Sequence, residues 1–473
     1  MKKAFFWSFA TNYLGIVINF ISVIVLARLL TPSQIGTFAI ASAIFAIGQI
    51  FRDMGVSSYL IRERNLSEAK VSGALAIVWI LCTSIALILF TIANPISIFY
   101  KLPELSKIFQ ILAVNILIIP FGTVAQTLLR REMNFKTLGG IELVSQTIHL
   151  VVAVSLALHN FGASSLAWAS LSATICTLLL LNVLVKKNKR YLPKLGEIST
   201  VFPSISTIGF ANVLATLNNR SASLIIGKSL SEGAVAIMDK SLVAIEMLNQ
   251  LLMKAIQNVL LPLFTKVRGQ RGDLKKVYLL ITDYTLLMAL PFLFYIAVLA
   301  EFVVLTLFGE QWVEAIPLIP VFALSAAFGL STRYFSEITI SLDLERVLLK
   351  LNLIVFVSKV ISIIFASPYG LIGIAYVLLA ISMFRAFYIM LLLKRFVGIG
   401  FLDFLRSIKV TLFVTLISTT PYWLGNFYSV DFQFYNAVVP LFLIVVAVWL
   451  SAIYITNHSA KVEVINIYKK LRK

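Results

Sequence analysis

Residues 72–94 have the sequence SGALAIVWILCTSIALILFTIAN, which contains no charged side chain. A run of this length matches the roughly 20 apolar residues that an α-helix needs to cross about 30 Å of hydrocarbon. Similar runs recur along the whole chain of 473 residues, of which 60% are hydrophobic and 13% are charged. A soluble domain usually has about 45–50% apolar and about 25% charged residues. The composition therefore predicts an all-α integral membrane protein, because a helix satisfies its own backbone hydrogen bonds in lipid.

The apolar runs predict about fourteen transmembrane helices. Each run is followed by a short loop, and the loops leave no room for a soluble domain on either face. The predicted spans are residues 8–30, 36–60, 72–94, 106–129, 139–159, 162–185, 203–228, 236–263, 278–308, 312–341, 346–366, 369–393, 403–424 and 434–456.

The loops between these spans alternate in charge. Every even-numbered loop is basic, as with Arg62, Arg64 and Lys70 after the second span, whereas the odd-numbered loops hold few charges. Lys and Arg concentrate in the cytoplasmic loops of membrane proteins. We therefore expect a multi-pass protein of the bacterial inner membrane with both termini in the cytoplasm. The net charge of +19 is explained by this topology, and we expect no nucleic-acid partner.

An internal repeat divides the chain. Residues 27–31 match residues 227–231, residues 99–100 match 308–309, and residues 162–168 match 370–376, at offsets of about 200–209. A repeat of six helices places both copies in the same orientation across the membrane. We predict an N-terminal six-helix lobe at residues 1–195 and a C-terminal six-helix lobe at 196–398. Two extra helices and a basic tail occupy residues 399–473.

Ionisable residues inside the spans are candidates for function, since such residues are costly in lipid and usually face a cavity or a partner. Arg333 and Glu337 are spaced so that they can pair on one helix face. Five basic residues have no opposite charge one turn away, and a cationic cavity suits an anionic passenger. We predict that this substrate-binding set comprises Arg52, Arg220, Lys254, Lys359 and Arg385.

Three further residues are the candidates for binding a coupling ion or proton, namely Glu142, His149 and Glu246. The spans also hold uncharged polar side chains, which are Asn12, Asn19, Gln49, Asn115, Gln126 and Gln146. No catalytic set can be argued from the spacing of the three histidines and the acids, and no Gly-rich phosphate loop is present. Cys82 and Cys176 lie in separate spans. We therefore expect no enzyme activity, no metal and no cofactor.

Short segments from the first span to the eighth form an ordered set. They are FFWS at 5–8, LARLLTP at 26–32, DMGV at 53–56, LRREMNF at 129–135, GASSLAW at 162–168, IIG at 225–227 and LLPLF at 260–264. This set resembles the polysaccharide transporters, the O-antigen and exopolysaccharide flippases of the multidrug, oligosaccharidyl-lipid and polysaccharide flippase superfamily.

The resemblance implies a fold of two six-helix lobes in a V with two added C-terminal helices. It implies an oligosaccharide on undecaprenyl pyrophosphate as substrate, carried from the cytoplasmic to the periplasmic leaflet by alternating access. Polymerases and glycosyltransferases of the same pathway, and membrane lipid, are the implied partners. The related lipid II flippases have cavity arginines, and Arg52 is the position here that is similar to one.

Two other readings remain open at the level of sequence. A cation-coupled drug exporter of the same superfamily would have an acidic cavity, whereas the charges without a neighbouring partner here are mostly basic. A membrane polysaccharide polymerase or ligase would need reactive residues on a large external loop, and every predicted external loop is short.

Overall fold

The computed structural model describes residues 2–53, 56–63, 67–184, 193–194, 198, 216–270, 272–430, 432 and 435–456. Within these ranges the regular elements are helices, with no strand. The described parts of the predicted spans are mainly helix, with turns inside them at residues 119, 299, 316–317 and 332–334. Residues 203–215 of the seventh span lie outside the described residues. The chain is an all-α integral membrane protein, as the composition predicted.

The described part contains eight helical segments that are long and apolar enough to cross a membrane. A ninth is obtained if the bent pair formed by α5 (Glu104–Ile118) and α6 (Pro120–Arg131) is one span. The two members of this pair meet at an angle of 53°. The count of fourteen spans stays a prediction.

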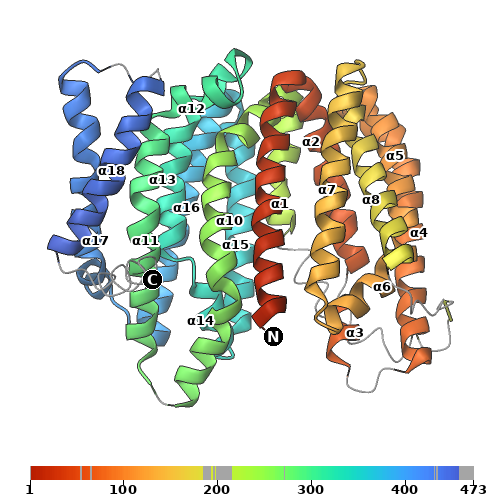
Figure 1. The fold of residues 1–473 in the computed structure, drawn as a ribbon, viewed down its shortest axis with the longest axis horizontal. Coiled ribbons are helices and arrows are strands. Elements are labelled where there is room, and N and C mark those ends of the chain that lie inside the picture. The colour runs from red at the N-terminus through yellow and green to blue at the C-terminus, as the bar shows by residue number, and fades with distance from the viewer. Residues whose placement is uncertain are drawn as a thin grey trace. The chain divides into compact units, whose positions relative to one another are not determined.

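The backbone forms two compact units, Met1–Ala236 and Ile237–Lys473. In the first unit, α7 packs against both α1 and α8, and α4 packs against α5 (Figure 1). A helix over residues 216–229 and the start of α10 (Glu232–Gly269) complete this unit. Its other helices are α1 (Lys2–Leu29), α2 (Pro32–Asp53), α3 (Val56–Arg62), α4 (Glu68–Tyr100), α5, α6, α7 (Phe135–Leu158) and α8 (Ser164–Leu184).

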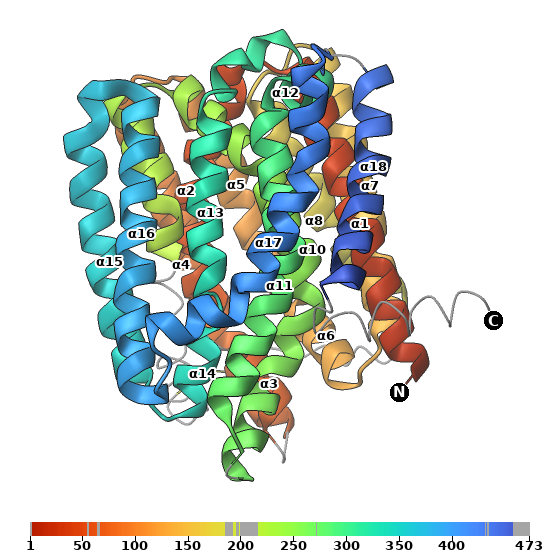
Figure 2. The ribbon, with the colours of Figure 1, turned by 90° about the vertical axis from the view of Figure 1, so that its left-hand side faces the viewer.

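In the second unit, α11 packs against α13 and α17, and α16 packs against α13 and α15 (Figure 2). α17 also packs against α18. Beyond the rest of α10, the elements are α11 (Leu274–Val298), α12 (Ala300–Leu307), η2 (Glu310–Ala315), α13 (Leu318–Ser331), α14 (Phe335–Ser341), α15 (Glu345–Ala366), η3 (Ser367–Tyr369), α16 (Gly370–Val397), α17 (Phe401–Phe427) and α18 (Tyr435–Ile455).

The turns between helices repeat along the chain. Left-handed backbone occurs at Lys101 and Gly309, at Met133 and Asp343, and at Gly162 and Gly370. The members of these pairs lie 208, 210 and 208 positions apart, which agrees with the offsets of the sequence repeat. Two helix starts correspond as well, because the Thr31 hydroxyl caps α2 and the Ser231 hydroxyl caps α10. The repeat is thus visible in the backbone, while the lobe boundaries at 195 and 398 stay a prediction.

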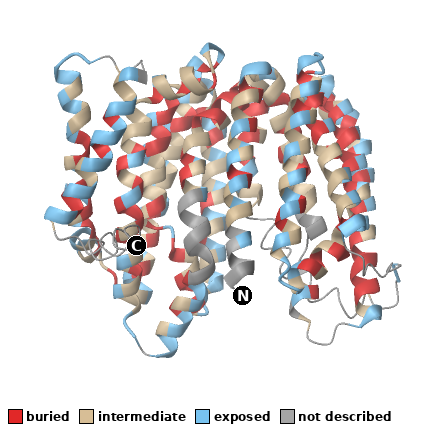
Figure 3. Cartoon of the chain, in the orientation of Figure 1, coloured by how far each residue is buried: buried red, intermediate tan, exposed pale blue. Residues whose placement is uncertain are grey.

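Large apolar side chains are exposed along the helices as well as at their ends. Phe90 on α4, Leu416 on α17 and Phe442 on α18 are examples from the middle of long helices. Figure 3 shows exposed positions running the length of several helices. A soluble protein rarely exposes contiguous apolar surface on this scale, so these sides of the helices are suited to contact with lipid.

Candidate functional site

A polar cavity of about 920 Å³ lies inside the first unit. Its walls come mainly from α1, α6, α7 and α8. Cavities of about 300–1,000 Å³ are typical of ligand sites. Polar side chains at membrane depth tend to face such a cavity rather than lipid. The cavity is therefore the candidate site for a polar passenger.

One face of α7 supplies the ionisable groups. Glu142, Gln146 and His149 all line the cavity, as their i, i+4 and i+7 spacing on a helix requires. The Gln146 side-chain Nε2 donates a hydrogen bond to Glu142 Oε1 at 3.3 Å. The Gln146 Oε1 atom is buried with no hydrogen-bond partner. This oxygen lies against α1, because a Cβ atom added at Gly15 would come within 3.0 Å of it.

A second wall of the cavity comes from α1. Asn12 and Asn19, seven residues apart, both line the cavity, and Thr11 lies next to them with its hydroxyl donating to the Trp7 carbonyl at 2.7 Å. The two helices approach closely because α7 has a glycine, Gly139, against Thr11. This close approach sets how far the polar groups of the two helices stand apart.

A second pocket of about 410 Å³ shares its lining with the first at Gln126, His149 and Thr177. It adds Gln49 from α2 and Asn115 from α5. All six uncharged polar side chains singled out from the sequence therefore line one or both of these pockets. The sequence identified them separately, and the fold of the first unit gathers them.

The second pocket also borders the break between α5 and α6, at Ile119. Pro120 lacks a backbone N–H and starts the new helix, and the Ile119 carbonyl accepts from the Thr123 hydroxyl at 3.1 Å. A turn also separates α13 from α14 at residues 332–334, although Leu318–Ser341 is not bent as sharply as the α5–α6 pair. Interrupted spans at corresponding positions of two repeats often mark transporter binding sites.

Hydroxyl groups fix the wall that α8 provides. The Ser145 and Thr177 hydroxyls lie 2.7 Å apart, linking α7 to α8. The Thr174 hydroxyl donates to Asn115 Oδ1 at 2.9 Å, linking α8 to α5. These bonds orient Asn115 and Thr177 at the cavity surface.

Arg130 lines the cavity, although it comes directly after the fourth predicted span and thus in one of the basic even-numbered loops predicted from the sequence. It is exposed and lines the cavity at the last turn of α6. Its neighbour Arg131 instead donates to the Leu60 carbonyl of α3 at 2.5 Å. The sequence feature that could have indicated this is the pair of adjacent arginines at a helix end. Consecutive side chains on a helix point to different sides, so one of the two could face the cavity.

The predicted site residues are distributed over both units. Glu142 and His149 come together in the cavity, whereas Glu246 lies exposed on α10 in the second unit. Arg220 is exposed on the helix over residues 216–229, Arg385 is exposed on α16, and Lys359 is half-buried on α15. The side chains of Arg52 on α2 and Lys254 on α10 lie outside the described residues.

Metal-binding groups do not cluster in the described ranges, where no set of three His, Cys, Asp or Glu residues could hold a metal ion. Cys82 on α4 and Cys176 on α8 are not joined in a disulfide. The cavity therefore offers hydrogen bonds, one carboxylate, one imidazole and one guanidinium to its contents.

The fold and the cavity define the class of the protein, a helical multi-pass membrane protein with a cavity lined by polar side chains. A family model described as polysaccharide biosynthesis protein matches residues 25–317, which is more than half of the chain. The chain therefore belongs to this polysaccharide biosynthesis family.

Two relatives and one solved structure illustrate the similarity. The succinoglycan biosynthesis transport protein ExoT of Rhizobium meliloti is 26% identical, over 67% of this chain and 65% of its own length. The chain thus matches slightly less than two thirds of that relative. A membrane protein in the cps region of Klebsiella pneumoniae is 21% identical over 88% of this chain and 86% of its own. The structure of the lipid II flippase MurJ, 14% identical, superposes over all of both chains with a TM-score of 0.71, which shows a shared fold.

Proposed function

We propose that this protein is a flippase for a lipid-linked oligosaccharide used in surface polysaccharide synthesis. The observation that carries the proposal is a cavity lined by polar side chains among apolar helices, in a member of a polysaccharide biosynthesis family. Supporting it, relatives are named for succinoglycan transport and lipid II flipping. The substrate would be an oligosaccharide on undecaprenyl pyrophosphate, moved from the cytoplasmic to the periplasmic leaflet by alternating access.

The glycan part of the substrate would occupy the cavity of the first unit. Amide and hydroxyl groups both donate and accept hydrogen bonds, so they match the hydroxyl groups of sugars. Asn12, Asn19, Gln126 and Gln146 supply such groups around the cavity. A sugar entering lipid loses its water, and these groups replace the lost hydrogen bonds.

The pyrophosphate would bind Arg130. Arginine recognises phosphate oxygens through two parallel N–H donors, and Arg130 lines the cavity at the end of α6. The predicted basic set then provides further anion contacts along the route as part of the same proposal. That set is Arg52, Arg220, Lys254, Lys359 and Arg385.

The polyprenyl chain would remain in an apolar environment. A groove of about 420 Å³ lies within the second unit, between α11, α12 and α18. Phe292, Leu441, Val445 and Trp449 are among its lining residues. Because α18 is one of the two added C-terminal helices, we propose that this part of the chain contacts the tail.

Ion or proton coupling is part of the proposal. Glu142 and His149 share the cavity, which places two titratable groups beside the passenger. Glu246 is the third candidate. The proposal places the protein in the inner membrane with both termini in the cytoplasm. Its proposed partners are polymerases and glycosyltransferases of the same pathway, and it is proposed to have no enzyme activity of its own.

Deletion of the gene tests the flippase function. We expect loss of surface polysaccharide and accumulation of the complete lipid-linked repeat unit, accessible only from the cytoplasmic side. Accumulation of single repeat units in the periplasm would instead show a polymerase or ligase. Unchanged polysaccharide with increased drug sensitivity would show a drug exporter.

The substitution Arg130→Gln tests the anion contact. We expect greatly reduced polysaccharide at normal protein levels, with partial recovery in Arg130→Lys because the charge returns without the planar fork. Arg346→Gln is the matched control, since Arg346 is exposed at the start of α15. Full polysaccharide in Arg130→Gln would exclude this residue from substrate binding.

A further inference from the structure

Helix α10 crosses the boundary between the two compact units. Residues 232–236 of this helix belong to the first unit, and the residues from Ile237 onward belong to the second. The helix over residues 216–229, which precedes α10 in the chain, lies wholly in the first unit. The start of α10 is therefore where a movement of the second unit is transmitted to the first.

The larger part of α10 is held by the second unit through a buried cation. The Lys240 side chain is buried, and its ammonium nitrogen lies 5.4 Å from the ring centroids of both Phe308 and Trp312. These two aromatic residues come from the end of α12 and from η2. A cation over aromatic rings is attracted more strongly when it is removed from water, so this contact fixes α10 to the loop between α12 and α13.

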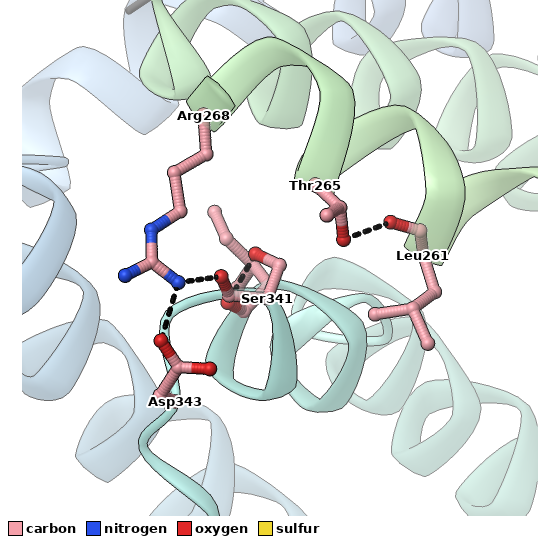
Figure 4. A network of polar contacts seen from close by, with 6 residues as sticks. Leu261, Thr265, Arg268, Ser341 and Asp343 are labelled. Atoms are coloured by element: carbon pink, nitrogen blue, oxygen red, sulfur yellow. Dashed lines mark hydrogen bonds and ion pairs between the residues drawn. The ribbon is translucent and has the colours of Figure 1, made fainter.

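The far end of α10 is also fixed within the second unit. The buried rings of Phe264 on α10 and Tyr278 on α11 stack with their centroids 6.5 Å apart. Beyond them, Arg268 donates to the Ser341 carbonyl and forms an ion pair of 2.7 Å with Asp343, which joins α10 to the end of α14 (Figure 4). Beyond its first turns, α10 therefore moves as part of the second unit.

The segment before α10 is attached to the end of α4. The Lys228 ammonium group donates to the Phe99 carbonyl in the last turn of α4, and it lies 4.0 Å from the centroid of the Phe99 ring. A cation at a helix C-terminus also interacts favourably with the helix dipole. The Tyr100 hydroxyl, one residue further along α4, donates to the Leu224 carbonyl at 3.1 Å. Both contacts lie beside odd-numbered loops, which the charge pattern predicts to be outside the cytoplasm.

The start of α10 is attached to α2. The Ser33 hydroxyl in the first turn of α2 donates to Glu232 Oε1 in the first turn of α10 at 2.8 Å. Close packing accompanies this bond, because a Cβ atom added at Gly227 would lie 2.6 Å from Ile40 Cδ1 of α2. We call the contacts of residues 224–232 with α2 and α4 the external latch.

Among the described residues, the lining of the polar cavity stops short of the external latch. It stops at residue 22 of α1, at residue 149 of α7 and at residue 173 of α8. The ends of these helices on the side of the latch lie at residues 29, 158 and 164, and there an apolar core packs them together. The cavity of the first unit therefore adjoins the basic loops and is closed on the external side.

We infer that the external latch is a gate, closed in this structure, and that residues 224–232 separate from α2 and α4 when the cavity opens to the external side. The inference rests on the proposed function, because alternating access requires one side of the cavity to close before the other opens. The latch is the weaker attachment of α10. Its polar contacts at Ser33 and Lys228 are exposed and contribute little to stability, whereas Lys240 and the Phe264 ring are buried in the second unit.

Cross-linking of the latch in cells tests the gate. The pair Ser33→Cys and Glu232→Cys, made together with Cys82→Ala and Cys176→Ala, is joined by a short reducible bifunctional thiol reagent. We expect synthesis of surface polysaccharide to stop on cross-linking and to resume after reduction. Normal polysaccharide before the reagent is added shows that the variant folds.

A cross-link at the same face that spares the latch is the matched control. Asn94→Cys and Ser106→Cys provide it, because the Ser106 hydroxyl donates to Asn94 Oδ1 at 2.6 Å and joins α4 to α5. This pair should be cross-linked without loss of polysaccharide. Continued synthesis in fully cross-linked Ser33→Cys and Glu232→Cys protein would overturn the inference.

Labelling of a buried cysteine reports the gate without reference to any cargo. Ile40 is fully buried, so Ile40→Cys should react with a membrane-impermeant maleimide only while the latch is open. Lys228→Gln should increase the labelling rate by about two- to five-fold, the effect of losing one exposed polar contact. Lys266→Gln, exposed in the last turn of α10, should leave the rate unchanged. An equal rate in Lys228→Gln and in the original protein would overturn the latch.

The two experiments separate the gate from the cargo. If deletion of the gene leaves surface polysaccharide unchanged, the flippase proposal fails. The labelling rates then still decide the gate, because they do not depend on what the protein transports. They also decide it if the cysteine pair does not fold.

Discussion

Two adjacent glycines of α7 allow a sharp test of the packing that shapes the cavity. Gly139 is buried, and a Cβ atom added there would lie 2.4 Å from the Thr11 Oγ1 and 2.7 Å from its Cβ. Gly140 is exposed, and a Cβ atom added there would meet nothing within 4 Å. The substitutions Gly139→Ala and Gly140→Ala therefore differ in steric contact while making the same chemical change.

The expected difference follows from two opposing effects. Replacing glycine by alanine inside a helix contributes about 1 kcal/mol in favour of folding at either position. At Gly139 the contact must open from 2.4 Å to at least 3.0 Å. Thr11 is β-branched with little rotamer freedom, so the backbone of α1 must move with it. Overpacking of this kind costs about 1–3 kcal/mol, and this cost is the expected difference between the two variants.

Unfolding of the purified variants in detergent measures this difference. We expect Gly140→Ala to be slightly more stable than the original protein. We expect Gly139→Ala to be less stable than Gly140→Ala by the overpacking cost of about 1–3 kcal/mol. Thr11→Ser combined with Gly139→Ala should recover part of the loss, because serine lacks the methyl group that lies 2.6 Å from the new Cβ. Equal stability of the two alanine variants would refute the close packing of α1 on α7.

Three further predictions concern other contacts. Gly36→Ala should sharply reduce the folded amount in membranes, because its Cβ would lie 1.7 Å from the Glu232 backbone oxygen, which cannot rotate away. Thr411→Val should lower the free energy of unfolding in detergent by about 1–3 kcal/mol, since the Thr411 hydroxyl donates to the buried Asp283 carboxylate at 2.6 Å. An unchanged unfolding midpoint would contradict this. Arg268→Ala should lower the free energy of unfolding by only about 0–1 kcal/mol, because its ion pair with Asp343 is exposed. A larger loss would show that the hydrogen bond from Arg268 to the Ser341 carbonyl at the end of α14 contributes more than the ion pair.

Several features could be read from the sequence because their causes are local. The length of an apolar run fixes whether a helix can cross the bilayer, so the helices appear where the runs are. The turn glycines at 162 and 370 were visible as repeat landmarks, and both adopt positive φ. The six uncharged polar residues were also identified, because any polar side chain within an apolar run is conspicuous.

The cationic site was harder to predict. Arg130 was assigned to a loop because basic residues at span ends usually report topology, yet α6 continues through Arg131 and brings Arg130 to the cavity. Glu337 was interpreted as a partner of Arg333 from spacing alone. Spacing of four residues allows a pair on one helix, but Arg333 lies in the turn before α14, and no ion pair joins it to Glu337 among the described residues.

The sequence by itself determined the membrane class, the positions of the helices, the repeat and the family resemblance. Each of these depends on residues within one span or on the order of spans along the chain. Only the tertiary structure decided which polar groups face the same cavity and which buried oxygens lack a partner. These properties depend on the rotation of each helix and on side chains far apart in sequence, as with Asn12 of α1 and Glu142 of α7. Hydropathy does not encode that rotation, because both a lipid-facing and a protein-facing side of a membrane helix are apolar.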